Sequence, residues 1–258
     1  MSLVSLEERD GVAILALDRP PANAFSPELV SELAARVSES AQARAVVLTS
    51  INPRIFSGGW DLPRVSLLPR AEMEDFVEAY FDLVRRIFVS DGPFLAALPG
   101  HAIAGGLIVA AAADERYVAD DPARVGLSEV ALGVPLPACC LEIFRYVIGP
   151  RAMERLTASA ENMPVERALA IGLVDRAVPT SDLLSSAVER ASALARGGRP
   201  AYAETKRRAR AETLARFDAA RQDDPFLDYW FAADARQRIA ALIEKLTGKK
   251  ESGDRPIS

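Results

Sequence analysis

The sequence predicts an α/β protein with a helical C-terminal extension. Through the first 180 residues, short apolar segments bounded by turn-forming residues alternate with amphipathic segments. This alternation is typical of buried strands separated by helices. The strand pattern then ends, and Gly197, Gly198, Arg199 and Pro200 mark a turn-rich boundary. We therefore expect a β/α body over residues 1–198 and a helical region over residues 199–258.

The composition indicates a compact soluble protein with an acidic surface. The chain has 258 residues, half of them hydrophobic, and carries a formal net charge of −5. A chain of this length can bury a full hydrophobic core. The acidic balance disfavours nucleic acid and anionic membranes as partners, although a few local cations can still hold a small anionic ligand.

The cysteines and the N-terminus predict a cytoplasmic protein. Cys139 and Cys140 are adjacent, which makes an ordinary disulfide between them strained, and a reducing compartment is the simplest interpretation. The N-terminal segment MSLVSLEERDG contains early acids and no cationic flank to an apolar run, so no signal peptide is predicted. Charges interrupt every apolar segment before it reaches the length of a bilayer span.

Individual elements follow from local patterns. Ser26 and Pro27 form a typical helix start, and the apolar residues that follow recur on one helical face. The predicted strands cover residues 12–18, 44–50, 93–100, 115–120, 123–129 and 173–178. Besides the helix that begins at Pro27, the predicted helices cover residues 72–88, 107–113, 181–196, 199–216 and 225–247. The polar tail, residues 248–258, is expected to fray.

Two glycine pairs each follow a predicted strand. Gly58 and Gly59 lie in RIFSGGWDL (54–62), and Gly105 and Gly106 lie in GHAIAGGLIVAAAADE (100–115). Backbone N–H groups at a helix start are unpaired and carry partial positive charge. Two such turns can each supply one N–H group to a single oxygen and so form an oxyanion hole. For the second pair taken alone, tight packing of the following helix under its neighbours is the favoured explanation.

Several motifs together resemble the crotonase superfamily, the enoyl-CoA hydratase/isomerase family. They are RPPANAFS (19–26), IFSGGWDL (55–62), GHAIAGGLIVAAAADERYVADD (100–121), VGLSEVALGV (125–134) and AIGLVDRAVP (170–179). The resemblance implies a ClpP/crotonase-like β-β-α spiral and a C-terminal helical region used for oligomerisation, as a homotrimer or homohexamer. It also implies an acyl-CoA thioester substrate, with coenzyme A as part of that substrate, and neither a separate cofactor nor a metal.

The resemblance carries catalytic roles to particular residues. The backbone N–H groups of Trp60 and Gly105 are expected to form the oxyanion hole, and Glu129 takes the position of a catalytic acid. Hydratases of the family use a second glutamate, and here that position holds Ile108. A segment at 136–140 replaces their glycine-rich stretch. Moving a double bond requires one carboxylate, whereas hydration requires water held by paired groups. The pattern is therefore most similar to the Δ3,Δ2-enoyl-CoA isomerase branch.

The resemblance also suggests which residues contact the two parts of the substrate. For coenzyme A the residues are Ala22, Asn23, Ala24, Arg54, Gly58, Asp61 and Leu62. Proximity in sequence adds apolar and aromatic side chains for the acyl pocket, namely Trp60, Leu67, Phe76, Tyr80, Ile108 and Cys139. Arg64 and Lys206 are further candidate partners for the phosphates. The sole histidine, His101, is expected to be structural.

Other functions remain open at this level. An acyl-CoA decarboxylase needs the oxyanion hole without Glu129, and a thioester hydrolase needs an activated water. An enoyl-CoA hydratase would require a substitute acid such as Glu142, although an ion pair or a solvated face is the simpler role for that residue. A non-catalytic acyl-CoA-binding protein would keep the fold and show no turnover.

Overall fold

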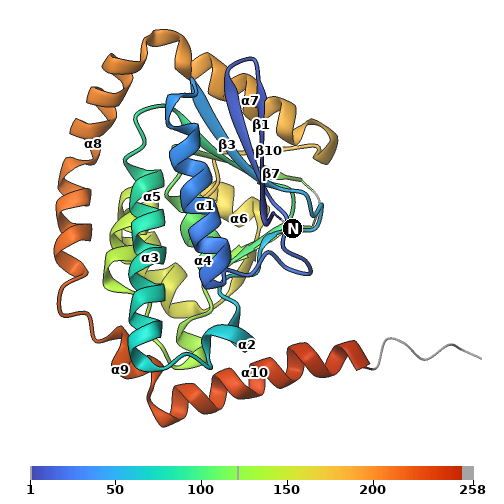
Figure 1. Cartoon of the computed structure of the whole chain (residues 1–258), viewed down its shortest axis with the longest axis vertical. Coiled ribbons are helices and arrows are strands. Elements are labelled where there is room, and N and C mark those ends of the chain that lie inside the picture. Colours follow the sequence, from blue (N-terminus) through green and yellow to red (C-terminus); the bar gives the residue numbers. More distant parts are fainter. Residues whose placement is uncertain (1, 121, 252–258) are drawn as a thin grey trace, which may run out of the picture.

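The computed structural model describes residues 2–120 and 122–251 and contains two sheets enclosed by helices (Figure 1). The tail expected to fray at 248–258 lies mostly outside the described residues. The large sheet has the strand order β1 (Val4–Arg9), β2 (Val12–Leu17), β3 (Ala45–Ser50), β5 (Phe94–Leu98), β7 (Glu115–Ala119) and β10 (Arg176–Val178). The β1–β2 pair is antiparallel, and the other pairs are parallel.

The small sheet has the order β4 (Ile55–Ser57), β6 (His101–Ile103), β8 (Arg124–Gly126) and β9 (Asn162–Pro164). The chain alternates between the sheets: β3, β5 and β7 join the large sheet, and the strands that directly follow them, β4, β6 and β8, join the small one. Helices α2 and α3 then connect β4 to β5, and α4 connects β6 to β7, so that the chain returns to the large sheet. This alternation is the β-β-α spiral, and it places the segments after β4, β6 and β8 side by side.

Ten α-helices and four short 3₁₀ helices complete the described part of the chain. The α-helices are α1 (Pro27–Glu39), α2 (Leu62–Val65), α3 (Arg70–Phe88), α4 (Gly105–Ala111), α5 (Ala138–Ser159), α6 (Val165–Ala170), α7 (Leu183–Leu194), α8 (Arg199–Ala220), α9 (Phe226–Trp230) and α10 (Ala233–Glu251). The 3₁₀ helices are η1 (Ser40–Gln42), η2 (Val130–Leu132), η3 (Thr180–Asp182) and η4 (Ala195–Gly197).

Both faces of the large sheet are covered. Residues of β2, β3, β5 and β7 that point to one face pack with Leu183, Ala187 and Ala191 of α7. Residues on the opposite face join the main core with α1, α3 and α4. Because β2, β3 and β5 are buried along their whole length, they read in the sequence as continuous apolar runs. α8 packs along α5 at one edge of the body (Figure 1).

The structure confirms the predicted strand 93–100 as β5, with shorter ends, and corrects one predicted helix. The chain turns after β5 at Gly100, where a Cβ would lie 1.9 Å from the carbonyl oxygen of Arg54, so backbone crosses backbone there. The predicted helix 225–247 breaks after Trp230. The break allows α9 to bury Phe226 and Trp230, while α10 packs on α2 and η2.

Other predicted elements agree in position, with shifted ends, and four strands are missed. The helix start at Ser26 is confirmed, since its hydroxyl accepts a hydrogen bond from the N–H of Leu29 (3.4 Å). The strands β1, β4, β6 and β9 were not predicted as separate elements, and β4, β6 and β9 have three residues each. Strands this short carry no periodicity that sequence analysis can detect.

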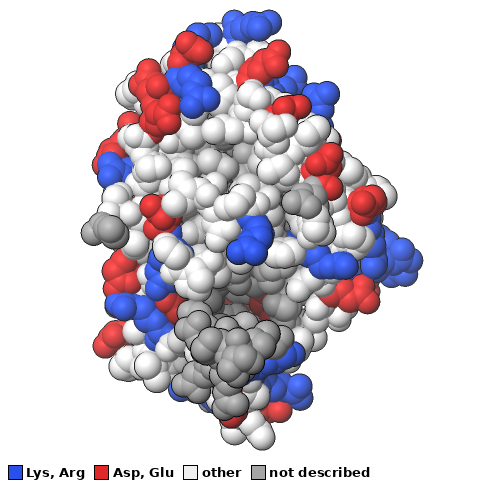
Figure 2. Space-filling model, turned by 90° about the vertical axis from the view of Figure 1, so that its right-hand side faces the viewer, with Lys and Arg blue, Asp and Glu red and all other residues white. Residues whose placement is uncertain are grey.

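On the face shown in Figure 2, basic and acidic side chains are interspersed between uncharged areas. Among the described residues, no helix combines the length and the apolar composition that crossing a membrane requires. The boundary at residue 198 and the oligomerisation through the C-terminal helices stay predictions.

Candidate active site

The two glycine turns meet because β4 and β6 are neighbours in the small sheet. These strands pair in parallel, with Ser57 opposite Ala102, so the turns that follow them leave the same edge. A Cβ on Gly59 would lie 3.3 Å from the amide nitrogen of Gly105. Gly59 also has φ +93°, a conformation that favours glycine. The turns are therefore packed backbone against backbone.

The glycines that open α4 are required by what lies against them. A Cβ on Gly105 would lie 2.9 Å from Cδ1 of Trp60, and one on Gly106 would lie 2.6 Å from the carbonyl oxygen of Ser57. Either contact would push the two turns apart. Ala104, directly before them, has φ +49°, which is strained for a residue with a Cβ. Its N–H donates to the carbonyl of Gly126 (2.8 Å), which ties this turn to β8.

Two backbone N–H groups are left free at this junction. The N–H of Phe25 donates to Gly59 (2.7 Å) and its carbonyl accepts from Asp61 (2.9 Å), which fixes both neighbours of Trp60. In the part of the chain that the structure describes, neither Trp60 nor Gly105 donates its own backbone N–H. Two such donors on adjacent turns can stabilise negative charge on one oxygen.

Glu129 follows β8, the strand next to β6, and precedes η2. Its backbone carbonyl accepts from Leu132 (2.9 Å) and Val134 (3.2 Å), which holds the turn. The Oε2 atom is buried and has no hydrogen-bond partner within the described chain. Burial raises the pKa of Glu129 from 4.5 to about 7, although backbone N–H groups near it favour the charged form. Such a carboxyl group can both accept and return a proton near neutral pH.

Both turns and Glu129 line one cavity of about 930 Å³. α9 and α10 also contribute to its wall. The lining includes Arg19, Ala22, Ala24, Gly58, Trp60, Asp61, Leu62, Gly105, Ile108, Glu129, Phe226, Trp230, Arg238, Leu242 and Leu246. A concave, mainly apolar space with a few directed polar groups is the usual form of a small-molecule site.

Of the residues expected to contact coenzyme A, five line the cavity and two do not. Ala22, Ala24, Gly58, Asp61 and Leu62 line it. Asn23 lies behind the wall, where its side-chain amide donates to the hydroxyl of Ser50 (2.7 Å) and the carbonyl of Phe56 (3.0 Å). Its role is thus to hold the loop. Arg54 is exposed on the turn before β4, outside the lining.

The expected acyl-pocket residues divide in the same way. Trp60 and Ile108 line the cavity, whereas Phe76, Tyr80 and Cys139 are buried outside the lining. Leu67 lies at the surface with 81% of its area exposed. Tyr80 has a supporting role, because its hydroxyl donates to the carbonyl of Gly105 (2.5 Å). Burial raises the pKa of Tyr80, so the hydroxyl keeps its proton.

The remaining polar candidates are used elsewhere in the fold. Arg64 forms an exposed ion pair with Glu28, and Lys206 is buried against Asp114. Glu142 pairs with Arg145 (3.2 Å) and Arg216 (2.7 Å) and is absent from the cavity lining.

His101 and the cysteines are structural in the described part of the chain. His101 accepts a hydrogen bond from the backbone N–H of Arg124 at Nδ1 (2.9 Å). Cys139 and Cys140 are buried as free thiols, with their sulfur atoms 4.0 Å apart. The described residues include no group of three or more His, Cys, Asp or Glu side chains placed to hold a metal ion.

Sequence analysis missed the contribution of the C-terminal helices to the cavity. Phe226, Trp230, Arg238 and Leu242 line it, although they lie about a hundred residues after Glu129. One signal was present: Phe226 and Trp230 are four residues apart and share a helical face. Arg19 was also missed; it lines the cavity and forms an ion pair with Asp61.

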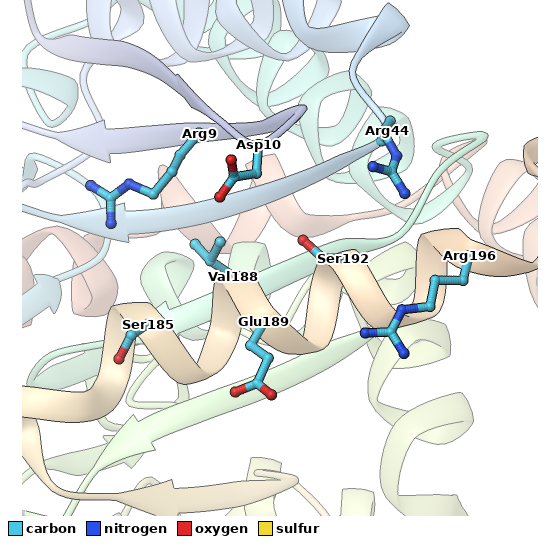
Figure 3. Close-up of a pocket in the computed structure, with 8 residues that line it drawn as sticks. All are labelled: Arg9, Asp10, Arg44, Ser185, Val188, Glu189, Ser192 and Arg196. Atoms are coloured by element: carbon cyan, nitrogen blue, oxygen red, sulfur yellow. The ribbon is translucent and has the colours of Figure 1, made fainter.

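A second pocket of about 470 Å³ lies between the β1–β2 turn and α7 (Figure 3). It contains neither a glycine turn nor Glu129. Arg9, Arg44 and Arg196 come from three separate segments, and their guanidinium groups do not converge on one point in Figure 3. The two glycine turns and Glu129 therefore line the larger cavity and not this second pocket.

Comparison with known proteins gives a consistent assignment. The model of the enoyl-CoA hydratase/isomerase family matches residues 7–250. Human mitochondrial enoyl-CoA delta isomerase 1 is 33% identical over 190 residues, which cover 72% of this chain and 63% of the relative. The match thus spans somewhat less than two thirds of that relative's length. A protein of Mycobacterium avium named probable enoyl-CoA hydratase is 32% identical over 207 residues, covering 79% of this chain and 80% of the relative.

The fold is also found in solved structures. The crystal structure of human mitochondrial Δ3,Δ2-enoyl-CoA isomerase superposes with a TM-score of 0.90 at 29% sequence identity, covering 96% of this chain and 99% of that one. The predicted spiral fold is therefore confirmed. Isomerases and hydratases are similar to this chain at nearly the same identity, so similarity alone does not select the reaction.

Proposed function

Because this chain belongs to the enoyl-CoA hydratase/isomerase family, we propose that it is a Δ3,Δ2-enoyl-CoA isomerase. The observation that carries the proposal is a single free carboxyl group in the cavity beside two free backbone N–H groups. The acids among the lining residues are Asp61 and Glu129, and Asp61 is held by Arg19. Ile108 lines the cavity where a hydratase has its second glutamate, and its side chain cannot transfer a proton.

The proposed reaction moves one proton along the substrate. The thioester oxygen of a 3-enoyl-CoA accepts hydrogen bonds from the N–H groups of Trp60 and Gly105. Glu129 removes a proton from C2, and the electrons move onto the thioester oxygen to give a dienolate. The protonated Glu129 then donates to C4, and the double bond shifts to C2–C3. Each oxyanion-hole donor is expected to stabilise the charged state by about 3 kcal/mol.

The buried carboxyl group suits both halves of this cycle. A base with a pKa of about 7 is substantially ionised at neutral pH, and its conjugate acid is strong enough to return the proton. The burial of Oε2 limits the access of bulk water to this oxygen during the transfer. Hydration needs a positioned water and a second acid–base group, and Glu142 is engaged with two arginines outside the cavity.

The test follows the ultraviolet absorbance of the conjugated thioester after addition of trans-3-enoyl-CoA substrates. Glu129→Gln is expected to lower kcat by about 10² to 10⁴-fold, because an amide cannot accept the C2 proton. Glu142→Gln, the same change outside the cavity, is the matched control and should remain near the wild-type rate.

Other outcomes separate the alternatives. Loss of absorbance from a 2-enoyl-CoA in the wild type, without isomerisation, would identify a hydratase. Release of CO₂ from a malonyl-type thioester that persists in Glu129→Gln would identify a decarboxylase, and free thiol release a hydrolase. Binding of acyl-CoA without turnover of any thioester would reject the enzyme assignment.

A further inference from the structure

The cavity contains an aromatic wall formed by Trp60, Phe226 and Trp230. The ring of Trp60 lies edge-on to Phe226 (centroids 5.7 Å apart) and to Trp230 (5.8 Å), and the last two rings are 6.1 Å apart. Phe226 and Trp230 are 3% and 1% exposed. They come from α9, which Figure 1 shows between the long helices α8 and α10. Two distant parts of the chain thus build one surface.

The aromatic wall stands directly beside the oxyanion hole. The indole of Trp60 belongs to the residue whose backbone N–H is one of the two donors. Its Cδ1 atom would lie 2.9 Å from a Cβ on Gly105, the other donor. An acyl group whose carbonyl oxygen is held by these donors therefore begins next to Trp60, and Phe226 and Trp230 are the neighbouring rings in the cavity lining.

Side chains of α3 fill the space behind Trp60, the first ring of the aromatic wall. Phe76 and Tyr80 of α3 pack edge-on against Trp60, with centroids 5.1 and 5.4 Å away. Both side chains are buried, and Tyr80 is fixed by its bond to Gly105. The same cavity of about 930 Å³ must also hold the pantetheine arm, because Ala22, Ala24 and Leu62 belong to its lining. The acyl chain and the pantetheine arm therefore share this cavity.

Packing alone holds the wall in place. The indole nitrogens of Trp60 and Trp230 are both buried and have no hydrogen-bond partner among the described residues. Replacing Trp230 by a smaller apolar side chain therefore opens space without leaving a new unpaired polar group.

We propose that Trp230 is a specificity-determining residue that closes the acyl end of the cavity and limits the length of the acyl chain that the protein binds. The inference deepens the proposed function and rests on it for the reaction. Its test uses binding, so that it can fail separately from the reaction.

The experiment measures Kd for saturated butyryl-, hexanoyl-, octanoyl-, decanoyl- and dodecanoyl-CoA by titration calorimetry. These thioesters bind without reacting in an isomerase. Each buried methylene is expected to tighten Kd by about fourfold, until the chain meets Trp230 and the affinity falls. In Trp230→Leu the tightest-binding acyl-CoA should be a longer member of the series, and Trp230→Phe should lie between the two proteins.

Tyr229→Leu is the matched control, because Tyr229 is the neighbouring aromatic residue on α9 and is half exposed. It should keep the wild-type order of affinities. If Trp230→Leu does not fold, the smaller change in Trp230→Phe still decides the question. An order of affinities that is the same in wild type and in each folded Trp230 variant would overturn the proposal, whether or not the protein isomerises 3-enoyl-CoA.

Discussion

Two buried polar regions of this protein are built in opposite ways. The Asp114 cluster, made of Asp114, Tyr202, Lys206 and Arg210, joins α8 to the large sheet. Asp114 Oδ1 accepts from Lys206 and Arg210 (both 2.8 Å), and Oδ2 accepts from Tyr202 (3.0 Å). In the cavity, by contrast, an oxygen of Glu129 and the indole nitrogens of Trp60 and Trp230 are buried without partners among residues 2–120 and 122–251.

The difference separates stabilising groups from reactive ones. In the Asp114 cluster each carboxylate oxygen is bonded, and the charge of Lys206 is compensated even though burial lowers its pKa to about 8. Such groups hold a helix in place and are not available to a ligand. An unpaired buried carboxyl group costs stability, and it persists where a substrate uses it. Removing a paired group of the Asp114 cluster should therefore destabilise the protein, whereas removing the unpaired carboxyl group of Glu129 should stabilise it at pH values where that group is charged.

The largest effect is expected from removing the centre of the paired region. Asp114→Ala leaves Lys206 and Arg210 buried without a counter-charge and should lower the free energy of unfolding by about 3–5 kcal/mol. Urea denaturation measures the change. Asp218→Ala, which removes a half-exposed ion pair with Arg85, should cost at most about 1 kcal/mol. Equal losses of unfolding free energy in Asp114→Ala and Asp218→Ala would contradict the expectation that a buried charge cluster contributes more to stability than a half-exposed ion pair.

The second-largest effect is expected from displacing one of the two unpaired backbone N–H donors at the cavity. Gly105→Ala places a Cβ against Trp60 and displaces the N–H group of residue 105, so kcat should fall by about 10² to 10³-fold. Steady-state kinetics with a 3-enoyl-CoA measures it. The control is Gly197→Ala, since a Cβ on Gly197 meets nothing within 4 Å. A Gly105→Ala enzyme with the wild-type kcat would contradict the expectation that catalysis depends on the close packing of this turn against Trp60.

The smallest effect is a pH-dependent gain in stability. An unfolded Glu129 titrates near 4.5 and the folded residue near 7, so the unfolded state releases the proton first. Wild-type stability should therefore fall as the pH rises through this window. Glu129→Gln, which carries no charge, should exceed the wild type at pH 8 by at most about 3 kcal/mol.

Thermal unfolding followed at several pH values between 4 and 8 measures this gain. The exposed Glu8→Gln should change stability by less than about 0.5 kcal/mol at each pH. A wild type that is equally or more stable than Glu129→Gln at pH 8 would show that the carboxylate is compensated in the folded protein.

The catalytic part of the site was more predictable than its walls. Trp60, Gly105 and Glu129 were assigned from motifs that resemble the family, and the spiral brings the three segments to one cavity. Leu67 and Cys139 were placed in the pocket from sequence proximity, which does not give side-chain direction. Leu67 faces solvent, and Cys139 is buried outside the lining.

The sequence by itself determined the α/β body, the helical C-terminal region and the residue types of the reacting groups. These features depend on local patterns, since strand burial, helix capping and glycine turns act over a few residues. Only the tertiary structure decided which groups remain unpaired and which side chains enclose the cavity. Phe226 and Trp230 reach Trp60 across more than 160 residues of chain, and Lys206 finds Asp114 rather than a phosphate. Such pairings depend on how α8, α9 and α10 pack against the body, and no local segment encodes them.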